Sequence, residues 1–407
     1  MSAVTPQRPF VGARVLLGVS GGIASYKTAW LARLLTLAGA EVDVVMTPAA
    51  LEFVGAITFE ALTGRPAHSE IFGPGHALDH VKLARSAQAI VVAPATADFC
   101  ARAACGQAND LLTAILLAAK APVLLVPAMN DQMWAHPQTA NNVAHLRAIG
   151  YDVLEPDAGL LAVGEGSGPG RMPEPETILA HAGWLLEDHA SFAGKRFIVT
   201  AGPTHEPVDP VRYLTNHSSG KMGVAIAAAA WRRGAEVVLV SGPSTIQPPP
   251  GVCVVRVETT EQMRDAVAAE LPNADALVMA AAPADFRAAE PATKKIKKAA
   301  RPGSLALAST VDILASTKNA RRPGMVTVGF ALETNDVISN GRAKLDAKDL
   351  DLLVANDATE KGAGFSVDTN RVTILSRDGA DEVLPLLPKA EVADAILDRV
   401  ARLFNGR

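Results

Sequence analysis

The chain has 407 residues, of which 49% are hydrophobic, 20% charged and only 4% aromatic. This composition is typical of a soluble globular protein with two or three domains, whose cores must be filled by alanine, valine and leucine. A formal net charge of −4 argues against binding to nucleic acid or a membrane surface, and the broken apolar runs predict no membrane span. The start of the chain has no apolar signal segment, and its three cysteines show no metal or disulfide spacing. We therefore expect a cytoplasmic protein.

A β-loop-α-β pattern opens the chain. Val15–Gly18 is a short apolar strand, a glycine turn follows, and a helix runs to about Ala38 before the strand Glu41–Met46. Such a unit begins a doubly wound parallel sheet. The turn lacks a full G-x-G-x-x-G motif, and no acidic residue stands where a ribose partner is expected. Residues Ser20–Gly22 therefore favour a mononucleotide phosphate over a dinucleotide.

Two further buried strands are predicted at Ala89–Ala93 and Pro122–Val126, and each runs into a loop marked by proline. In an open α/β sheet, the loops at the carboxyl ends of the strands form the ligand crevice. We therefore expect these two loops to face the same site as the first glycine turn. Thr96 and Asn130 are the polar residues placed there, although a purely structural role in a turn is an equal alternative for Asn130.

Residues 157–175 contain five glycines and three prolines, which predicts no regular element. A flexible linker is one interpretation, but the segment also carries several apolar side chains. A loop that closes over a ligand fits this composition better. A helix from Glu174 to about Asp188 follows, and we place the domain boundary after residue 190, which divides the chain into domains 1–190 and 191–407.

The second half is organised around residues 197–223. An apolar strand there runs into a polar loop, and Gly220 opens a helix of small residues. The start of such a helix favours an anion because of its N–H groups and dipole, although an ordinary strand–turn–helix connection is the alternative. Further buried strands are predicted at Glu236–Val240, Val252–Val257, Ala276–Ala280, Val326–Phe330 and Leu352–Ala355. They indicate a second α/β domain of the same class.

Lysines gather in two places of the second half. Four of them lie in the segment 293–298, beyond the end of a predicted strand. A solvated charged surface is the common explanation, but this position also suits a polyphosphate that is bound and released. Lys344 and Lys348 are four residues apart on a predicted helix, so they share one face.

Several motifs occur in a fixed order along the chain. In the first half they are G-V-S-G-G-I-A-S-Y-K at 18–27, H-V-K-L-A at 80–84, A-P-A-T-A-D at 93–98, A-N-D-L at 108–111, P-A-M-N-D-Q-M at 127–133 and G-P-G-R-M at 168–172. In the second half they are the stretch 197–223, A-A-P-A-D-F-R at 281–287, K-I-K-K at 295–298, G-F-A-L-E-T at 329–334 and A-N-D at 355–357. In this combination the chain resembles, over nearly its whole length, the bifunctional phosphopantothenoylcysteine decarboxylase/phosphopantothenate–cysteine ligases of bacterial coenzyme A synthesis.

The resemblance implies two Rossmann-like α/β domains. The first would be a flavodoxin-like flavoprotein domain of the HFCD type (flavin-containing cysteine decarboxylases), and the second a ligase domain with a parallel sheet. FMN is the implied cofactor of the first, and Mg²⁺ with CTP of the second. The implied ligands are 4'-phosphopantothenate, CTP, cysteine and phosphopantothenoylcysteine. The resemblance also implies a homo-oligomer with a trimeric flavin domain, often within a dodecamer, and a dimeric ligase domain.

For the decarboxylase, the resemblance implies that flavin oxidises the substrate's thiol to a thioaldehyde, which accepts the electrons left by loss of CO₂, before reduced flavin reduces the enethiol. His80 corresponds to the family's active-site histidine, and Asn130 to the asparagine that holds the departing carboxylate, with Met133 beside it. The residues that would hold FMN are Gly21, Gly22, Ile23, Thr47, Thr96, Ala97, Asp98 and Ala128. The substrate flap would include Gly168, Gly170, Arg171 and Met172.

The flap departs from the family pattern at Val163, where members have a cysteine that donates a proton to the enethiol. Valine cannot donate a proton, so Glu165, Ser167 or a water would have to do so, or the final reduction would be slow. A second interpretation follows, in which an active ligase is fused to a flavin-binding module with a structural or oligomerising role. A nicotinamide-dependent dehydrogenase is disfavoured because the glycine motif is incomplete. Cys100 and Cys105, in an alanine-rich helical pattern, are interpreted as packing residues.

For the ligase, the resemblance implies that CTP activates the phosphopantothenate carboxylate as an acyl-cytidylate, and that the amine of cysteine then attacks it. Asn216 corresponds to the asparagine that contacts this intermediate, and Lys295 to the lysine required to form it. The nucleotide site would consist of Ala280, Ala281, Asp285, Lys295, Asp312, Phe330, Lys344 and Lys348, with the lysines on the triphosphate. Pro283 stands where valine is expected, and proline has no N–H to donate.

Overall fold

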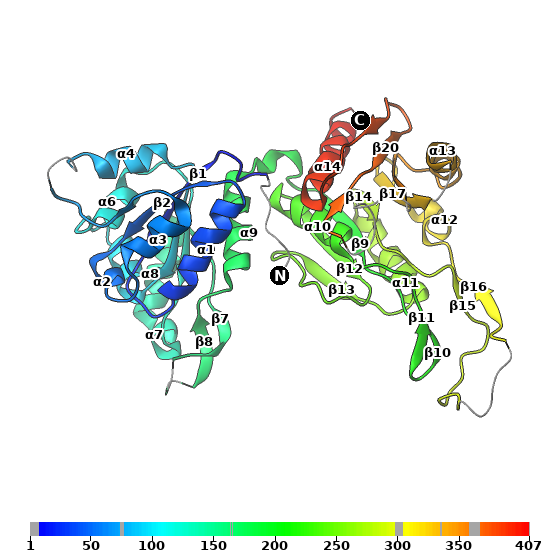
Figure 1. The fold of residues 1–407 in the computed structure, drawn as a ribbon, viewed down its shortest axis with the longest axis horizontal. Helices are drawn as coiled ribbons and strands as arrows, with labels where there is room; N and C mark the ends of the chain where they lie inside the picture. The colour runs from blue at the N-terminus through cyan, green and yellow to red at the C-terminus, as the bar shows by residue number, and fades with distance from the viewer. Residues whose placement is uncertain are drawn as a thin grey trace. The chain divides into compact units, whose positions relative to one another are not determined.

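The computed structural model describes residues 8–73, 77–162, 164, 166–297, 304–333, 336–357 and 367–406 (Figure 1). The chain divides into two compact units, Met1–Glu187 and Asp188–Arg407, whereas the sequence placed the boundary after residue 190. Both units are α/β. Among the described residues, no helix has the length and apolar character needed to cross a membrane.

A parallel six-stranded sheet with the order β3-β2-β1-β4-β5-β6 forms the centre of the first unit. Its strands are β1 Arg14–Val19, β2 Glu41–Met46, β3 Ala67–His68, β4 Ala89–Ala95, β5 Val123–Pro127 and β6 Asp152–Val153. The strand order reverses between β1 and β4, and a doubly wound sheet opens a ligand crevice at this point. The predicted doubly wound parallel sheet is confirmed.

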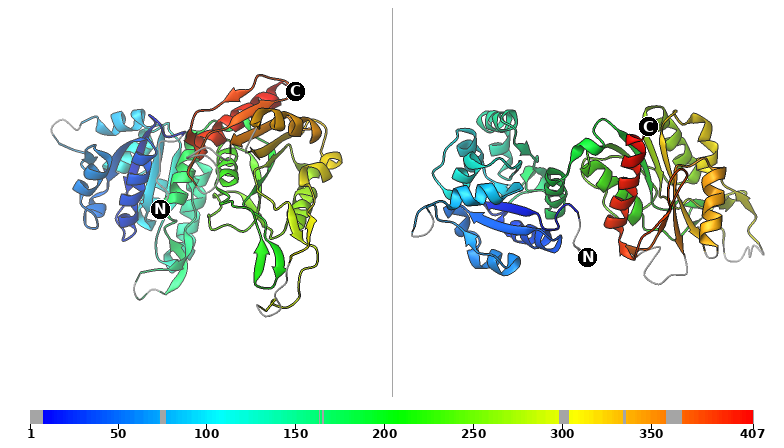
Figure 2. Two further views of the ribbon diagram at one scale, coloured as in Figure 1. Left: turned by 45° about the vertical axis from the view of Figure 1, so that its right-hand side comes forward. Right: turned by 90° about the horizontal axis from the view of Figure 1, so that it is seen from above.

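Helices cover both faces of this sheet, which explains why its central strands are apolar on both sides (Figures 1 and 2). The helices of the unit are α1 Ser25–Leu37, α2 Pro48–Leu51, α3 Ala56–Thr63, α4 Asp79–Ser86, α5 Ala97–Ala104, α6 Leu111–Ala118, α7 Asp131–Ala135, α8 Pro137–Ala148 and α9 Pro175–Leu186. One core cluster joins α1, α3 and α9 to the sheet, and the other joins α4, α5, α6 and α8 to it.

The glycine-rich segment before α9 is a hairpin, so the expectation of no regular element there was wrong. Strand β7, Asp157–Leu160, pairs antiparallel with β8, Ser167–Arg171. Glycine and proline lower strand propensity, but two short strands outside the main sheet satisfy each other's backbone groups without packed side chains. The prediction about Val163 and Glu165 falls on residues outside those that the structure describes.

An eight-stranded sheet with the order β13-β12-β9-β14-β17-β18-β20-β21 forms the centre of the second unit. Its strands are β9 Arg196–Ala201, β12 Glu236–Ser241, β13 Cys253–Arg256, β14 Ala276–Met279, β17 Val326–Glu333, β18 Leu352–Asp357, β20 Thr373–Ser376 and β21 Glu382–Val383. The six strands from β13 to β18 are parallel, as expected, and β20 and β21 add an antiparallel edge.

The second unit is also covered on both faces. One core cluster contains α10 and α14, and another contains α11, α12 and α13. These helices are α10 Lys221–Arg232, α11 Thr260–Glu270, α12 Ile313–Ser316, α13 Val337–Ala347 and α14 Lys389–Asn405; short 3₁₀ turns lie at His189–Ser191, Leu271–Asn273 and Lys318–Ala320. Thr259 caps α11 through a reciprocal capping box with Gln262, which fixes the start of this helix.

In the described part of the second unit, three two-stranded ladders lie outside its main sheet. They pair β10 Glu206–Asp209 with β11 Arg212–Leu214, β15 Phe286–Ala288 with β16 Leu307–Ser309, and β19 Thr369–Asn370 with β22 Leu387–Pro388. The first ladder lies inside the polar loop predicted between β9 and α10. It extends away from the sheet of this unit (Figure 1).

Candidate functional site

The first unit has a cavity of about 970 Å³ at the carboxyl ends of β1, β4 and β5. All the residues predicted to hold FMN line it: Gly21, Gly22, Ile23, Thr47, Thr96, Ala97, Asp98 and Ala128. Asn130, Met133, Gly170, Arg171 and Met172 line it as well. The loops that the sequence assigned to one crevice therefore meet around a single space.

The glycine turn before α1 is held close to its neighbours. A Cβ atom on Gly21 would lie 2.5 Å from the Cβ of Ala49, and real Cβ atoms do not approach this closely. The Ser20 hydroxyl donates to the carbonyl of Pro94 at 2.7 Å and accepts from the N–H of Thr96 at 3.1 Å. The turn is therefore fixed against the loop after β4, at the start of a helix, where an anion is favoured.

Two threonines at this cavity begin helices. Thr47 accepts a hydrogen bond from Ala50 N–H at 3.3 Å at the start of α2, and Thr96 accepts one from Phe99 N–H at 3.2 Å at the start of α5. Because each hydroxyl caps its own helix, these residues serve first to set the direction in which the helix leaves the cavity.

The flap strand β8 lies against the loop that carries Asn130. The N–H of Met129 donates to the carbonyl of Gly170 at 3.0 Å. Gly170 has φ +142°, and a Cβ there would lie 2.1 Å from the carbonyl oxygen of Met129, so only glycine fits. Gly168 does not line the cavity, but it packs closely against Asp131. A Cβ atom on Gly168 would lie 2.9 Å from the Cβ of Asp131. The Asn130 side-chain oxygen accepts from Gln132 N–H at 2.9 Å.

Among the described residues, three cations line this cavity, and the sequence reasoning singled out only Arg171. The Lys27 ammonium donates to the carbonyl of Met172 at 3.1 Å and pairs with Glu174 at 3.1 Å, so it secures the base of the flap. Arg102 pairs with Asp98 at 2.9 Å and with Asp110, the N-cap of α6, at 2.6 Å. Arg102 follows Asp98 by four residues, and this helical spacing of opposite charges is the sequence signal that could have identified Arg102.

Two cysteines near this site differ in environment. Cys100 is buried in the core, and burial raises the pKa of its thiol to about 12, so it stays protonated and unreactive at neutral pH. The packing role expected for it is confirmed. Cys105 is exposed at the end of α5, so the packing role expected for that residue was wrong. An alanine-rich helix pattern does not by itself say which turn reaches the core.

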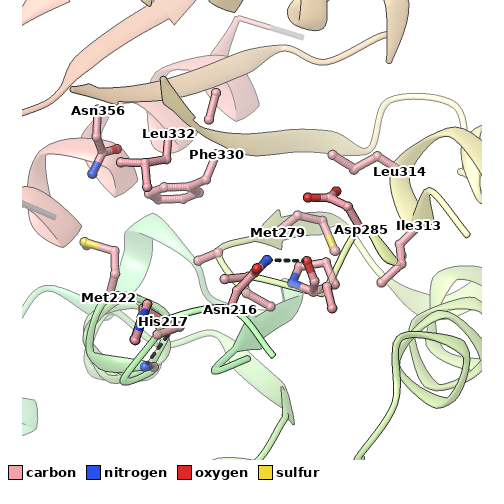
Figure 3. Close-up of a pocket in the computed structure, with 18 of the residues that line it drawn as sticks. Asn216, His217, Met222, Met279, Asp285, Ile313, Leu314, Phe330, Leu332 and Asn356 are labelled. Atoms are coloured by element: carbon pink, nitrogen blue, oxygen red, sulfur yellow. Dashed lines mark hydrogen bonds between the residues drawn. The ribbon is translucent and has the colours of Figure 1, made fainter. Parts of the chain in front are cut away.

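The second unit has a cavity of about 630 Å³ at the carboxyl ends of its parallel strands. It is lined by Asn216 and by these residues of the predicted nucleotide site: Ala280, Ala281, Asp285, Asp312, Phe330, Lys344 and Lys348. Figure 3 shows the side chains of Asn216, Asp285 and Phe330 around this space. They come from three segments that are far apart in the sequence.

Buried hydroxyl groups join the loop of Asn216 to the loop of Asp285. The fully buried Thr204 hydroxyl accepts from Ala284 N–H at 2.9 Å and lies 2.9 Å from the hydroxyl of Thr260. The Thr204 carbonyl accepts from the hydroxyl of Thr215 at 2.8 Å. The sequence reasoning missed Thr204, because a threonine after a strand carries no signal of a contact eighty residues away.

The Asn216 side chain also crosses between these loops. Its amide donates to the carbonyl of Pro283 at 2.9 Å. Pro283 has no N–H to donate, but the group that Asn216 uses here is its carbonyl, which proline retains.

Asp312 and Lys348 form an ion pair of 3.1 Å at one end of this cavity. Burial alone would raise the pKa of Asp312, but the N–H of Ala315 and the ammonium of Lys348 hold it below its ordinary value. Within the described ranges, no three His, Cys, Asp or Glu side chains come together as a metal site.

Besides Gly168, two further predicted residues, His80 and Lys295, do not line either cavity. His80 lies in the first turn of α4. Lys295 is exposed, and the following residue, Ile296, donates its N–H to the carboxylate of Asp209 at 3.1 Å, while Arg212 donates to the Ile296 carbonyl at 3.3 Å. Thus the Lys295 segment is held by the β10–β11 ladder, and the roles of His80 and Lys295 stay predictions.

Comparisons with known proteins cover both units. The family model described as "DNA/pantothenate metabolism flavoprotein C-terminal domain" matches residues 192–404, and the model "Flavoprotein" matches residues 4–182. The coenzyme A biosynthesis bifunctional protein CoaBC of Mycobacterium tuberculosis (strain ATCC 25618 / H37Rv) is 48% identical over 408 residues, covering 97% of each chain. That of Vibrio vulnificus (strain YJ016) is 44% identical over 398 residues, covering 97% of this chain and 98% of the relative. A crystal structure of the C-terminal domain of a CoaBC protein is 39% identical and covers 53% of this chain and 99% of that one, with a TM-score of 0.46.

Proposed function

The chain belongs to the family of coenzyme A biosynthesis bifunctional proteins, with a flavoprotein decarboxylase domain and a ligase domain. We propose which of the two reactions takes place in each of its two cavities. In the second cavity, cysteine is joined to 4'-phosphopantothenate in a reaction that consumes CTP. The first cavity decarboxylates the product, phosphopantothenoylcysteine, to 4'-phosphopantetheine. The observation that carries the proposal is that the loops carrying the two groups of motifs converge, one group on each cavity.

The first cavity suits FMN. Its volume of about 970 Å³ is large enough for a flavin mononucleotide, and the fixed glycine turn at the start of α1 favours a phosphate group. When bound, FMN supplies the two-electron oxidation of the substrate thiol that allows loss of CO₂, and the matching reduction afterwards. Gly21 and Gly22 would hold its phosphate end.

The residues of the first cavity then orient the substrate. The Asn130 side-chain oxygen is engaged by Gln132 N–H, which directs its amide N–H groups toward an acceptor such as the departing carboxylate. Arg171 and Lys27 add positive charge beside the flap. A flap held at its base by Lys27 would keep water away from the reacting atoms.

In the second cavity, an oxygen of the phosphopantothenate carboxylate attacks the α-phosphorus of CTP, and pyrophosphate leaves. The amine of cysteine next attacks the acyl carbon, and CMP leaves as the amide forms. Asn216 would donate to the acyl group, while Lys344 and Lys348 neutralise phosphate charge. Mg²⁺ commonly uses one or two carboxylates with substrate phosphates, so Asp285 would hold it together with CTP.

The test is to give the purified full chain FMN, 4'-phosphopantothenate, CTP, Mg²⁺ and cysteine, and to follow both products. We expect 4'-phosphopantetheine and CO₂. Phosphopantothenoylcysteine that accumulates without being decarboxylated would instead support a ligase fused to a flavin module without catalysis, which Val163 suggests. Lys295→Gln should stop acyl-cytidylate formation; a near wild-type rate would remove that residue from the mechanism.

Family membership also supports a cytoplasmic homo-oligomer, with a trimeric flavin domain and a dimeric ligase domain. Light scattering on the purified chain, with and without FMN, tests this part of the proposal. A monomer at micromolar concentration in both conditions would contradict it.

A further inference from the structure

Two arginines hold the end of helix α13. Arg321 donates through Nη1 to the carbonyls of Lys348 at 2.9 Å and Asp349 at 3.0 Å. Arg377 donates to the carbonyl of Leu350 at 2.9 Å and pairs with the carboxylate of Asp349 at 2.5 Å. The last carbonyls of a helix have no partner within the helix, and positively charged donors suit them. Both arginines therefore stabilise the point where α13 stops.

Arg321 also reaches a second element. Its Nη2 donates to the carbonyl of Leu314 at 2.5 Å, in the short helix α12. Leu314 and Lys348 both line the second cavity, whereas Arg321 does not. Figure 3 shows Leu314 on the same side of the cavity as Asp285. Arg321 thus lies behind the cavity and ties two segments of its wall to each other.

The two tied segments also meet through side chains. Asp312 caps α12 and pairs with the Lys348 ammonium at 3.1 Å. Leu314 follows Asp312 by two residues, so Arg321 bonds the backbone of the same two segments whose side chains form this ion pair. A flexible lysine is placed only as well as the backbone that carries it. The guanidinium therefore governs how far the Lys348 ammonium reaches into the cavity.

This arrangement is costly for the folded chain. Arg321 is partly buried, and its Nε is buried without a hydrogen bond to any described residue. Burial lowers the pKa of Arg321, although Asp349 acts in the opposite direction, and an arginine remains charged at neutral pH. Asp349 itself has φ +52°, in the left-handed region that residues other than glycine disfavour. Such costs are typical of places where a precise geometry is needed.

We propose that Arg321 is a positioning residue of the ligase site. It holds the segments of Leu314 and Lys348 at a fixed separation, and so sets the Lys348 ammonium against the phosphates of bound CTP without touching the nucleotide. The inference rests on the ligase function proposed above, and it adds to that function a residue outside the cavity.

The experiment compares Arg321→Met with Arg377→Met in the full chain. Arg377 is the matched control, because it holds the same helix end but bonds Leu345, Asp349 and Leu350, which do not line the cavity. Thermal unfolding should show a similar loss of stability in both variants. Steady-state assays should show KM for CTP raised roughly tenfold in Arg321→Met, with a smaller change in kcat. In Arg377→Met, KM should stay within about twofold of wild type.

Arg321→Lys keeps the charge but cannot bridge three carbonyls, so it should raise KM for CTP less than Arg321→Met does. It also carries the comparison with Arg377→Met if Arg321→Met does not fold. An equal rise of KM in the Arg321 and Arg377 variants would overturn the proposal, because it would indicate a general loss of stability. A KM in the Arg321 variants that matches wild type would overturn it as well.

A double-mutant cycle tests whether Arg321 acts through Lys348. If it does, KM for CTP in the double variant with Lys348→Met should lie within about twofold of Lys348→Met alone. Effects that multiply would contradict this route. Calorimetry with CTP on the same variants separates the two proposals. Wild-type protein that binds CTP but forms no amide would overturn the ligase function, while the pattern of CTP affinities would still decide the role of Arg321.

Discussion

The two cavities lie at equivalent places in two doubly wound sheets, yet they are built differently. The first is shaped mainly by backbone: Gly21 and Gly170 allow approaches that a side chain would block. The second is shaped by side chains, with Thr204, Asn216 and Lys389 reaching across from separate elements. A backbone cradle suits a cofactor that remains bound, whereas hydroxyl, amide and ammonium groups suit ligands that must enter, react and leave. Four predictions test this difference.

Asn216→Asp should have the largest effect. The substitution replaces an amide donor with a carboxylate beside the carbonyl of Pro283, so two oxygens would face each other and the acyl group would lose its donor. We expect the rate of ligation to fall about 100-fold or more, as when an oxyanion donor is removed. Flavin content should not change, because the residue belongs to the second unit. Loss of flavin in this variant would contradict the separation of the two sites.

Gly21→Ala should break the backbone cradle of the first cavity. The added methyl group meets Ala49 at 2.5 Å, so the turn must move, at a cost of about 1–3 kcal/mol. We expect flavin content, measured by absorbance after gel filtration, to fall about tenfold, while ligation is unaffected. Gly55→Ala is the matched control, since its Cβ would meet only Ile57, at 3.8 Å. Normal flavin content in Gly21→Ala would refute the cradle.

Thr204→Val should weaken the second cavity without removing any group that touches a ligand. It leaves the N–H of Ala284 without its acceptor in a buried place, at a cost of about 1–3 kcal/mol to folding. We expect KM for CTP to rise roughly five- to tenfold, because the Asp285 loop is no longer held. The fall in kcat should be smaller than this rise in KM. Thr204→Ser restores the hydroxyl and should rescue most of the effect. Equal losses in Thr204→Ser and Thr204→Val would point to packing instead.

The pH dependence of stability should show the smallest effect. Burial and the nearby charge of Lys221 lower the folded pKa of Lys389 from 10.5 to about 8, although Asp368 acts in the opposite direction. Because the unfolded chain holds this proton up to about pH 10.5, the ligand-free protein should gain stability between pH 8 and 10.5. Thermal unfolding measures this trend, and Lys389→Met should remove it. A trend that persists in that variant would exclude Lys389 as its source.

Much of the fold could be read from local patterns. The apolar runs became β1, β2, β4, β5, β9 and β12 within a residue or two, because a buried parallel strand must be apolar on both faces. The predicted FMN residues and most predicted nucleotide residues also share a cavity each, since parallel strands bring their carboxyl ends to one edge of the sheet.

Only the tertiary structure decided which distant groups meet. Thr204 reaches Ala284, and Lys221 and Lys389 share one end of a cavity although 168 residues separate them in the chain. Backbone pairing made the glycine-rich flap a hairpin, the folded helix α5 leaves Cys105 exposed, and hydrogen bonds hold the Lys295 segment on the β10–β11 ladder. The sequence by itself determined the elements and their loops, because periodicity and turn chemistry act between near neighbours. Burial, hydrogen bonds across loops and the pKa of Lys389 depend on which elements come together in space, so they required the folded chain.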